Sequence, residues 1–454
     1  MLTDICSCDV SITHRDALDA WNGVVLGVLS HGQTTGDHLS NLIAREPDFA
    51  MGHAMKGLAC LMLGRRELIS AASEANADAK RCLHLGGATE RETLWCKALN
   101  DWLAGKPSLS VLRMEQALSL NPADTISMKL SHGIRFILGD NHGMLHSVER
   151  VLSAHGTSHP LYGYALGCYA FALEETGHFQ KAERVGLRGL EFAADDAWGL
   201  HAVAHVYDMS HDTDRGIALI DDNQDAWSHC NNFRFHVWWH KALLHLDQGD
   251  IATVLDLYDT KVREEKTDDY RDVSNASSLL MRLELEGVNV GDRWTELADL
   301  AEKRAEDGCL TFADMHYMLA LIGEDRQEGA ARLTASVVRQ SQTRGDMANV
   351  MTLPGLALSE GLTAFGAADY GKAFAHMKAA QPHFQAMGGS HAQRDVFERL
   401  TIEAGLRAAR LAEAETLIRS RTALRAGQDD SFAARRLAQI AQVRSMATAS
   451  TAAE

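Results

Sequence analysis

The chain has 454 residues, of which 46% are hydrophobic, and its 44 basic and 61 acidic residues give a formal net charge of -17. This acidity argues against nucleic acid and anionic membranes as partners, because both attract basic surfaces. Only six prolines occur, and this scarcity of helix breakers predicts an almost wholly helical protein.

The first twenty residues contain no basic stretch followed by an apolar core, so we expect no secretory signal. Farther along, no run of about 18 apolar residues occurs, and no membrane span is expected. The eight cysteines are scattered, and Cys6 and Cys8 form C-x-C rather than the C-x-x-C of redox and zinc motifs. These features predict reduced thiols and a cytoplasmic location.

Turn signals recur along the chain after apolar stretches with helical periodicity, and no β pattern is evident. They fall at Gly64, Gly105, Gly139, Gly177, His211, Gly249, Gly287, Gly323 and Gly366. Their spacing of roughly 34 to 43 residues is typical of helix–turn–helix solenoid repeats. We expect each glycine to end the first helix of a repeat, where a left-handed residue is favoured.

The clearest repeat runs from Leu161 to Trp198, with an aromatic early in the first helix, Gly177 at the turn and Ala182 early in the second helix. The same plan recurs over residues 235–259 and 360–380. The sequence therefore predicts an all-α, right-handed α-solenoid of tetratricopeptide-like helix–turn–helix repeats. We expect residues 1–426 to form a single continuous superhelix, and residues 427–454 to form a C-terminal helix and frayed tail.

Four segments carry a more specific resemblance. They are DAWGLHAVAHVYDM (196–209), RDVSNASSLLMRLELEG (271–287), FADMHYMLAL (312–321) and GGSHAQRDVFERLTIEA (388–404). Together they resemble the tetratricopeptide repeat protein 38 family, over about residues 16–424. The resemblance implies a curved, soluble helical solenoid and carries no assignment of catalytic residues. Asn275 stands where the family has Asp.

Polar side chains recur at helical spacing in two neighbouring repeats. His201, His205 and Asp208 fall at i, i+4 and i+7, on one stripe of a helix, and the second set, His229, His236 and His240, also falls on one stripe. The first helices of a solenoid lie side by side along its concave surface. We therefore expect both stripes to line one groove. Further first helices would add Asp314, His316, His391 and Arg394.

Three interpretations of these residues stay open. Histidines at repeat interfaces can be structural, hydrogen-bonded to neighbouring helices. A groove lined by His, Asp, Arg and Trp also suits a polar ligand, while imidazoles and carboxylates can act as general bases or bind a metal. Residues that would bind a ligand are His236, Trp239, Asp314, His316, His391 and Arg394. Catalytic candidates are His201, His205, Asp208 and His240.

The leading hypothesis is a cytoplasmic scaffold whose His/Asp-lined concave groove binds a peptide or a small polar molecule. The alternative is an enzyme, a hydrolase, that uses the cluster formed by His201, His205, His236 and His240, with or without a metal ion. No cofactor is predicted and no metal ligand is assigned, although a divalent metal such as zinc is compatible with the residues. We expect no nucleic acid or membrane partner, and a homo-oligomer is compatible with the sequence.

Overall fold

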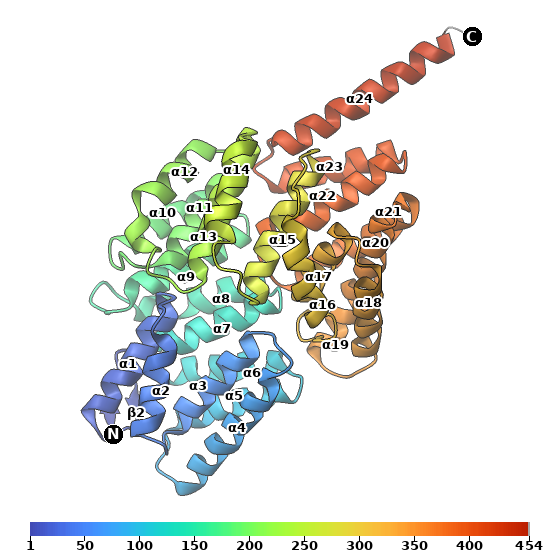
Figure 1. The fold of residues 1–454 in the computed structure, drawn as a ribbon. Coiled ribbons are helices and arrows are strands. Elements are labelled where there is room, and N and C mark those ends of the chain that lie inside the picture. Colours follow the sequence, from blue (N-terminus) through green and yellow to red (C-terminus); the bar gives the residue numbers. More distant parts are fainter. Residues whose placement is uncertain (453–454) are drawn as a thin grey trace.

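A short β-hairpin opens the chain in the computed structural model, which describes residues 1–452 and is otherwise almost entirely helical (Figure 1). Its strands are β1 (Leu2–Thr3) and β2 (Asp9–Val10), paired antiparallel with Leu2 opposite Val10. The sequence analysis missed this hairpin because each strand has only two residues. The Asp4 carboxylate anchors it, accepting a hydrogen bond from Trp21 Nε1 at 3.0 Å and pairing with Arg91 at 2.7 Å.

The helices follow in chain order. Those of the first half are α1 (Arg15–Leu29), α2 (Thr35–Arg45), α3 (Ala50–Met62), α4 (Leu68–Leu85), α5 (Glu90–Leu103), α6 (Pro107–Leu120), α7 (Thr125–Ile137), α8 (Asn141–Val151), α9 (Tyr162–Glu175), α10 (Phe179–Leu190), α11 (Ala197–Met209) and α12 (Thr213–Asp222). Those of the second half are α13 (Phe233–Gln248), α14 (Ile251–Leu257), α15 (Tyr270–Leu285), α16 (Arg293–Arg304), α17 (Thr311–Gly323), α18 (Gln327–Ser341), α19 (Asp346–Val350), α20 (Leu356–Gly366), α21 (Tyr370–Ala380), α22 (His391–Arg407), α23 (Leu411–Leu424) and α24 (Ser431–Ala452). Short 3₁₀ or π segments are η1 (Leu152–Ala154), η2 (Gln224–Ala226), η3 (Tyr258–Val262), η4 (Met351–Gly355) and η5 (Gln381–Met387).

Consecutive helices pack in pairs, among them α9 with α10 and α11 with α12, and this confirms the all-α array of helix pairs. Gly177 (φ 81°) and Gly249 (φ 77°) follow first helices in the left-handed region that favours glycine. Two expected turn residues, Gly323 and Gly366, are instead the last residues of α17 and α20. There the left-handed residues are Asp325 (φ 54°) and Ala368 (φ 57°).

The first helices of the central repeats form the core. α9, α11, α13 and α15 pack one against the next, and every residue of α11 is buried. A helix that is covered on all sides belongs to the interior of a protein rather than to its surface. The polar residues of α11 are therefore held inside the protein.

The array folds back on itself, so that distant repeats meet. Gly32 forms a β-bridge with Cys230, the Asp346 amide donates to the Gly105 carbonyl at 2.9 Å, and the Gln385 side chain donates to the Gly139 carbonyl at 2.8 Å. In an open solenoid each repeat contacts only its neighbours. These closing contacts and the burial of α11 show that the expected open concave groove is wrong for the histidine stripes.

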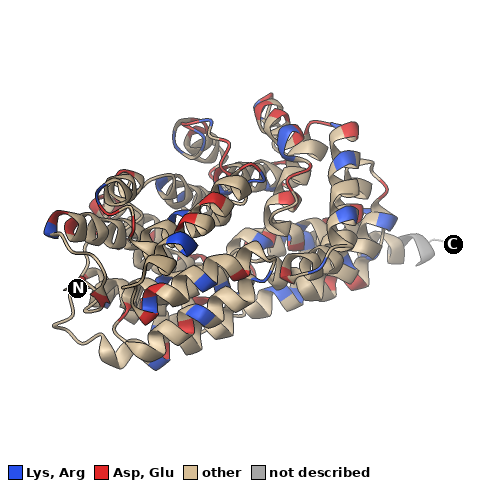
Figure 2. Ribbon diagram, turned by 90° about the horizontal axis from the view of Figure 1, so that it is seen from below, with Lys and Arg blue, Asp and Glu red and all other residues tan. Residues whose placement is uncertain are grey.

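The outer surface and the C-terminal end differ in character from this core. Acidic and basic residues are interspersed along the helices (Figure 2), and α24 extends away from the body (Figure 1). The segment 427–454, expected to form a C-terminal helix and frayed tail, contains α24, and its residues 453–454 lie outside the described residues. Within residues 1–452, no helix combines the length and apolar character needed to cross a membrane. All eight cysteines are free.

Candidate metal centre

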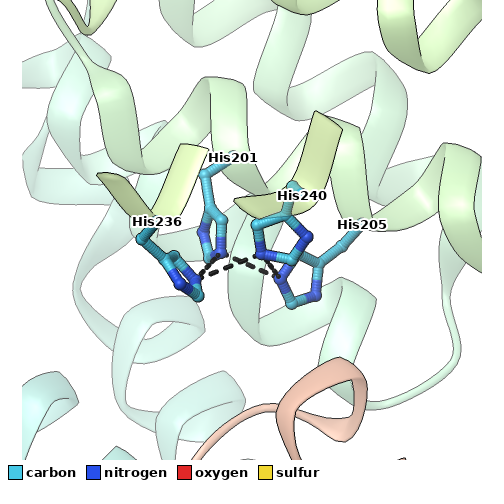
Figure 3. A group of neighbouring side chains, drawn as sticks. All are labelled: His201, His205, His236 and His240. Atoms are coloured by element: carbon cyan, nitrogen blue, oxygen red, sulfur yellow. Dashed lines mark hydrogen bonds between the residues drawn. The ribbon is translucent and has the colours of Figure 1, made fainter. Parts of the chain in front are cut away.

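Four histidines from two adjacent first helices meet inside the core. His201 and His205 lie one turn apart on α11, and His236 and His240 lie one turn apart on α13. Each residue of the first pair faces the residue 35 positions later. Because this offset matches one repeat, the two pairs come into register (Figure 3). We call these four residues the four-histidine cluster.

The four side chains converge through the same atom, Nε2. The Nε2–Nε2 distances are 3.0 Å between His201 and His236, 3.1 Å between His236 and His240, 3.1 Å between His240 and His205, and 2.8 Å between His205 and His201. The cluster is closed to solvent, with residue exposures from 0% to 9%. Four nitrogens thus surround one buried point.

Hydrogen bonding alone gives each Nε2 atom one partner and accounts for only two of the four close contacts. The Nε2 atom of a neutral imidazole either carries a hydrogen and donates, or carries a lone pair and accepts. A ring of four such atoms therefore holds at most two N–H···N hydrogen bonds, although four close contacts are present. A cation at the centre accepts all four lone pairs at once.

The outer nitrogens of two cluster members lie close to oxygen atoms, one of which forms a hydrogen bond. His236 Nδ1 lies 3.0 Å from Asn275 Oδ1, and His205 Nδ1 lies 3.3 Å from Glu174 Oε2. An acceptor at Nδ1 keeps the hydrogen there and leaves the lone pair on Nε2, directed at the centre. Metal-ligating histidines are characteristically held by carboxylate or carbonyl oxygens in this way. Within residues 1–452, neither His201 Nδ1 nor His205 Nδ1 has a hydrogen-bond partner, so the contact of His205 with Glu174 is a close electrostatic one.

Glu174 belongs to a second polar layer, which we call the acid–histidine layer: Glu174, Glu175, His391 and Arg394. His391 Nε2 lies 2.5 Å from Glu174 Oε1, and the His391 amide donates to Glu175 at 2.9 Å. Arg394 contacts Glu175 at 3.4 Å and donates to the Gly389 carbonyl. Arg394, one of the predicted ligand-binding residues, is thus already paired inside the protein. Ser390 caps α22 through a capping box, which places His391 and Arg394 in its first turn.

The electrostatics keep three members of the cluster, His201, His236 and His240, neutral. Burial, reinforced by the neighbouring imidazoles, holds the pKa values of His201 and His240 well below the usual histidine range. Burial lowers the pKa of His236 to about 3. Neutral imidazole is the form that binds metals, so these side chains carry available lone pairs at neutral pH.

The acid–histidine layer behaves in the opposite way. Burial opposes the charge of both partners, but the carboxylates of Glu174 and Glu175 outweigh it and raise the pKa of His391 to about 9. Burial alone would raise the pKa of Glu174, yet His391 and His205 hold it below its usual value. Glu174 is therefore an ionised carboxylate beside the four-histidine cluster.

The size of the cluster suits a first-row transition metal. With nitrogen–nitrogen edges of 2.8 to 3.1 Å, a central ion lies about 1.8 Å from each nitrogen in a tetrahedral arrangement and about 2.1 Å in a square one, which brackets the Zn–N distance of about 2.0–2.1 Å. Imidazole ligands suit Zn, Cu, Fe and Ni, whereas Ca²⁺ and Mg²⁺ require oxygen ligands.

Aromatic side chains wall the cluster. Trp239 is fully buried and stacks on His236 with ring centroids 5.2 Å apart, while Phe171 stacks on His201 at 5.6 Å. Trp239, one of the predicted ligand-binding residues, thus lies in the core. These rings exclude water, so charge at the centre is weakly screened.

The other predicted residues lie outside the cluster. His229 precedes α13 in a loop, with its Nε2 atom 3.0 Å from the Ser30 carbonyl, so the expected three-histidine stripe is wrong at this position. Asp208 pairs with Arg425 at 3.0 Å beside a cavity of about 20 Å³, which is room for one water molecule. His316 is buried against Phe312, and its Nδ1 atom lies 2.7 Å from the Phe312 carbonyl.

Asp314 is also buried, and burial together with Asp307 raises its pKa well above the usual range. The sequence analysis missed Glu174 and Glu175, which end α9. Asn275 was noticed only as a departure from the resembled family. The signal that could have found the acids is their place at the end of a first helix whose other residues are apolar.

Comparisons with known proteins complete this description. No family model matches the chain. Structures of the human IFIT1 dimer with m7Gppp-AAAA and with PPP-AAAA align with TM-scores of 0.39 and 0.37 and identities of 12% and 13%, each covering 92% of this chain and 99% of the other. A structure of Naa15/Naa10 bound to HypK-THB aligns with a TM-score of 0.24 at 11% identity, covering 90% of this chain and 64% of the other.

The fold of the described residues is an all-α array of packed helix pairs. Alignments this weak carry no inference about the ligands of this chain, although two of the aligned structures contain oligonucleotides. The absence of a nucleic-acid partner, which we expect from the net charge, therefore stays a prediction. The closer resemblance to the tetratricopeptide repeat protein 38 family also stays a prediction.

Proposed function

We propose that this protein holds a divalent first-row transition-metal ion, with zinc as the reference case, in the four-histidine cluster. The observation that carries the proposal is the convergence of four buried Nε2 atoms at 2.8 to 3.1 Å. Two hydrogen bonds are the most that these atoms can form with one another, whereas one ion uses all four lone pairs.

The surrounding residues support the same proposal. Asn275 places an acceptor at the outer nitrogen of His236, and the Glu174 carboxylate lies 3.3 Å from the outer nitrogen of His205, in the outer shell that histidine metal sites use. The negative charge of Glu174 also offsets part of the charge of a divalent ion. Without an ion, two of the four close Nε2 contacts are not hydrogen bonds.

A closed site favours a metal-holding role. Zinc in structural sites has four protein ligands, whereas a catalytic zinc keeps one position for water or substrate. Four histidines occupy every position of a tetrahedral ion and join α11 to α13, so the ion would tie two adjacent repeats together. The hydrolase expected as the alternative requires a position that this cluster does not leave open in a tetrahedral geometry.

A peptide or a larger polar ligand meets a different obstacle. The histidine side chains are buried, and such a ligand would have to separate α11 from the helices that cover it. The proposal for this site is therefore a single ion. The cytoplasmic location remains part of the proposal, on the basis of free thiols.

Metal analysis of the purified full-length protein tests this function. Wild-type protein is expected to retain about one equivalent of a transition metal after desalting, and His240→Ala is expected to lose it because one of four ligands is gone. His316→Ala is the matched control, since it removes an equally buried imidazole from outside the cluster. Wild-type protein reconstituted with zinc that keeps less than about a tenth of an equivalent would overturn the proposal.

A further inference from the structure

A second cavity lies far along the chain from the four-histidine cluster, at the seam where early repeats meet late ones. It encloses about 340 Å³ and is bordered by the α3–α4 and α5–α6 turns and by the loops after α16 and α18. The Asp346 amide donates to the Gly105 carbonyl at this seam, and the Asp346 carboxylate accepts from the Ser108 amide at 2.8 Å. Backbone contacts therefore hold its walls together.

The wall of this seam cavity combines apolar and polar surface in nearly equal parts. Its apolar side chains include Leu61, Ile69, Trp102, Leu103, Leu310 and Met347. Trp102 is almost fully buried, whereas Ile69 is 41% exposed, so the cavity runs from the core to the surface. A concave site of about 300 Å³ or more that combines apolar side chains with a few polar groups is typical of small-molecule binding.

Guanidinium groups supply the polar part of the seam cavity, and two of them lack an acidic partner. Within residues 1–452 the Arg344 side chain has no hydrogen-bond or ion-pair partner, and Arg66 donates only to the Glu306 carbonyl at 3.0 Å. Arg65 pairs with Asp268 at 2.5 Å, but its Nε atom has no acceptor. The cavity therefore carries surplus positive charge in a protein whose net charge is -17.

The nearby acids do not cancel this surplus. Glu67, Asp268 and Asp307 all pair with Arg304, at 2.7, 2.6 and 3.3 Å. Asp307 is the acid that borders the cavity, and it shares Arg304 with two other carboxylates, so only part of its charge is offset. Arg66 and Arg344 have no carboxylate partner among the described residues. Free guanidinium N–H groups beside apolar side chains suit a carboxylate, because guanidinium and carboxylate form charge-assisted hydrogen bonds in matching planes.

We infer that the seam cavity binds a small organic carboxylate with an apolar body. The volume of 340 Å³ equals about eleven water molecules at about 30 Å³ each, which corresponds to a ligand of about ten non-hydrogen atoms. The apolar body lies against Trp102, Leu103 and Leu310, and the carboxylate faces Arg66 and Arg344. This site is independent of the four-histidine cluster.

Calorimetric titration of the full-length protein with octanoate tests this inference. Octanoate is expected to bind at one site with a Kd of about 0.1–1 mM. The neutral analogue 1-octanol is expected to bind at least about tenfold more weakly, because it lacks the charged group. The double variant Arg66→Ala/Arg344→Ala should lose affinity by a similar factor.

Two further variants keep the test decisive. Arg332→Ala/Arg339→Ala removes the same charge from exposed positions of α18 that do not border the cavity, and it should bind octanoate like the wild type. Ile69→Trp fills the cavity mouth and should abolish binding while metal content stays unchanged. Absence of saturable octanoate binding below about 10 mM, equal affinity for 1-octanol, or equal losses in the two double variants would overturn the inference.

Discussion

Glu174→Gln is the substitution that most sharply separates a metal centre from a packed core. In the wild-type protein, the Oε2 atom of Glu174 lies 3.3 Å from His205 Nδ1, and the Glu174 side chain is fully buried. Glutamine keeps an oxygen at this position but removes the negative charge. Substitutions in the outer shell of metal sites cost about 10- to 100-fold in affinity, and we expect about tenfold here, since the nearby oxygen survives. Glu174→Ala removes this oxygen as well and should approach about 100-fold.

Glu175→Gln provides the matched control. The neighbouring acid is also buried, and it binds Asn141 at 2.8 Å and the His391 amide at 2.9 Å without touching the cluster. Zinc affinity is measured by competition with a chromophoric chelator, using equal protein concentrations. Glu175→Gln should stay within about threefold of the wild type. Equal losses in the two variants, or none in Glu174→Ala, would refute the role that we assign to Glu174.

Two further predictions concern the four-histidine cluster, and a third concerns the buried carboxyl group of Asp196. Removal of the metal by a chelator should lower the Tm by about 5 °C or more, as expected when a tightly bound ligand is lost, and added zinc should restore it; an unchanged Tm would argue against a tie between α11 and α13. Asn275→Asp should raise zinc affinity by up to about tenfold, because a carboxylate makes His236 a stronger ligand; chelator competition measures it, and a loss of affinity would count against the outer-shell assignment. Burial raises the pKa of Asp196 from 3.8 to about 7, so the folded state binds this proton more tightly and the free energy of unfolding should fall by at most about 4 kcal/mol as pH rises from about 4 to 7. In Asp196→Asn this part of the decline should vanish from urea titrations at pH 5 and pH 7.5.

The sequence predicted the pairing of the histidines because the repeat period and the helical period act together. An i, i+4 pair marks one face of a helix, and the same pair 35 residues later marks the same face of the next first helix. The missing information concerned burial. A stripe of His and Asp on α11 is typical of a polar groove, yet helices that fold back from later repeats cover this face.

The acid–histidine layer was unpredictable for a related reason. His391 contacts Glu174, which lies 217 positions earlier in the sequence. A repeat pattern predicts only the contacts between neighbouring repeats of a solenoid. The sequence does not show which acidic residue pairs with Arg394. The folded structure shows that its partner is Glu175. For His229 the cause is local, since α13 begins at Phe233 and the preceding loop turns the side chain toward Ser30.

X-ray absorption at the metal edge of the purified wild-type protein tests the central proposal most directly. We predict a metal whose first shell consists of four nitrogens at about 2.0–2.1 Å, with the outer-shell scattering of imidazole rings. An absent edge after zinc reconstitution, or a first shell dominated by oxygen or sulfur, would contradict a metal held by residues 201, 205, 236 and 240.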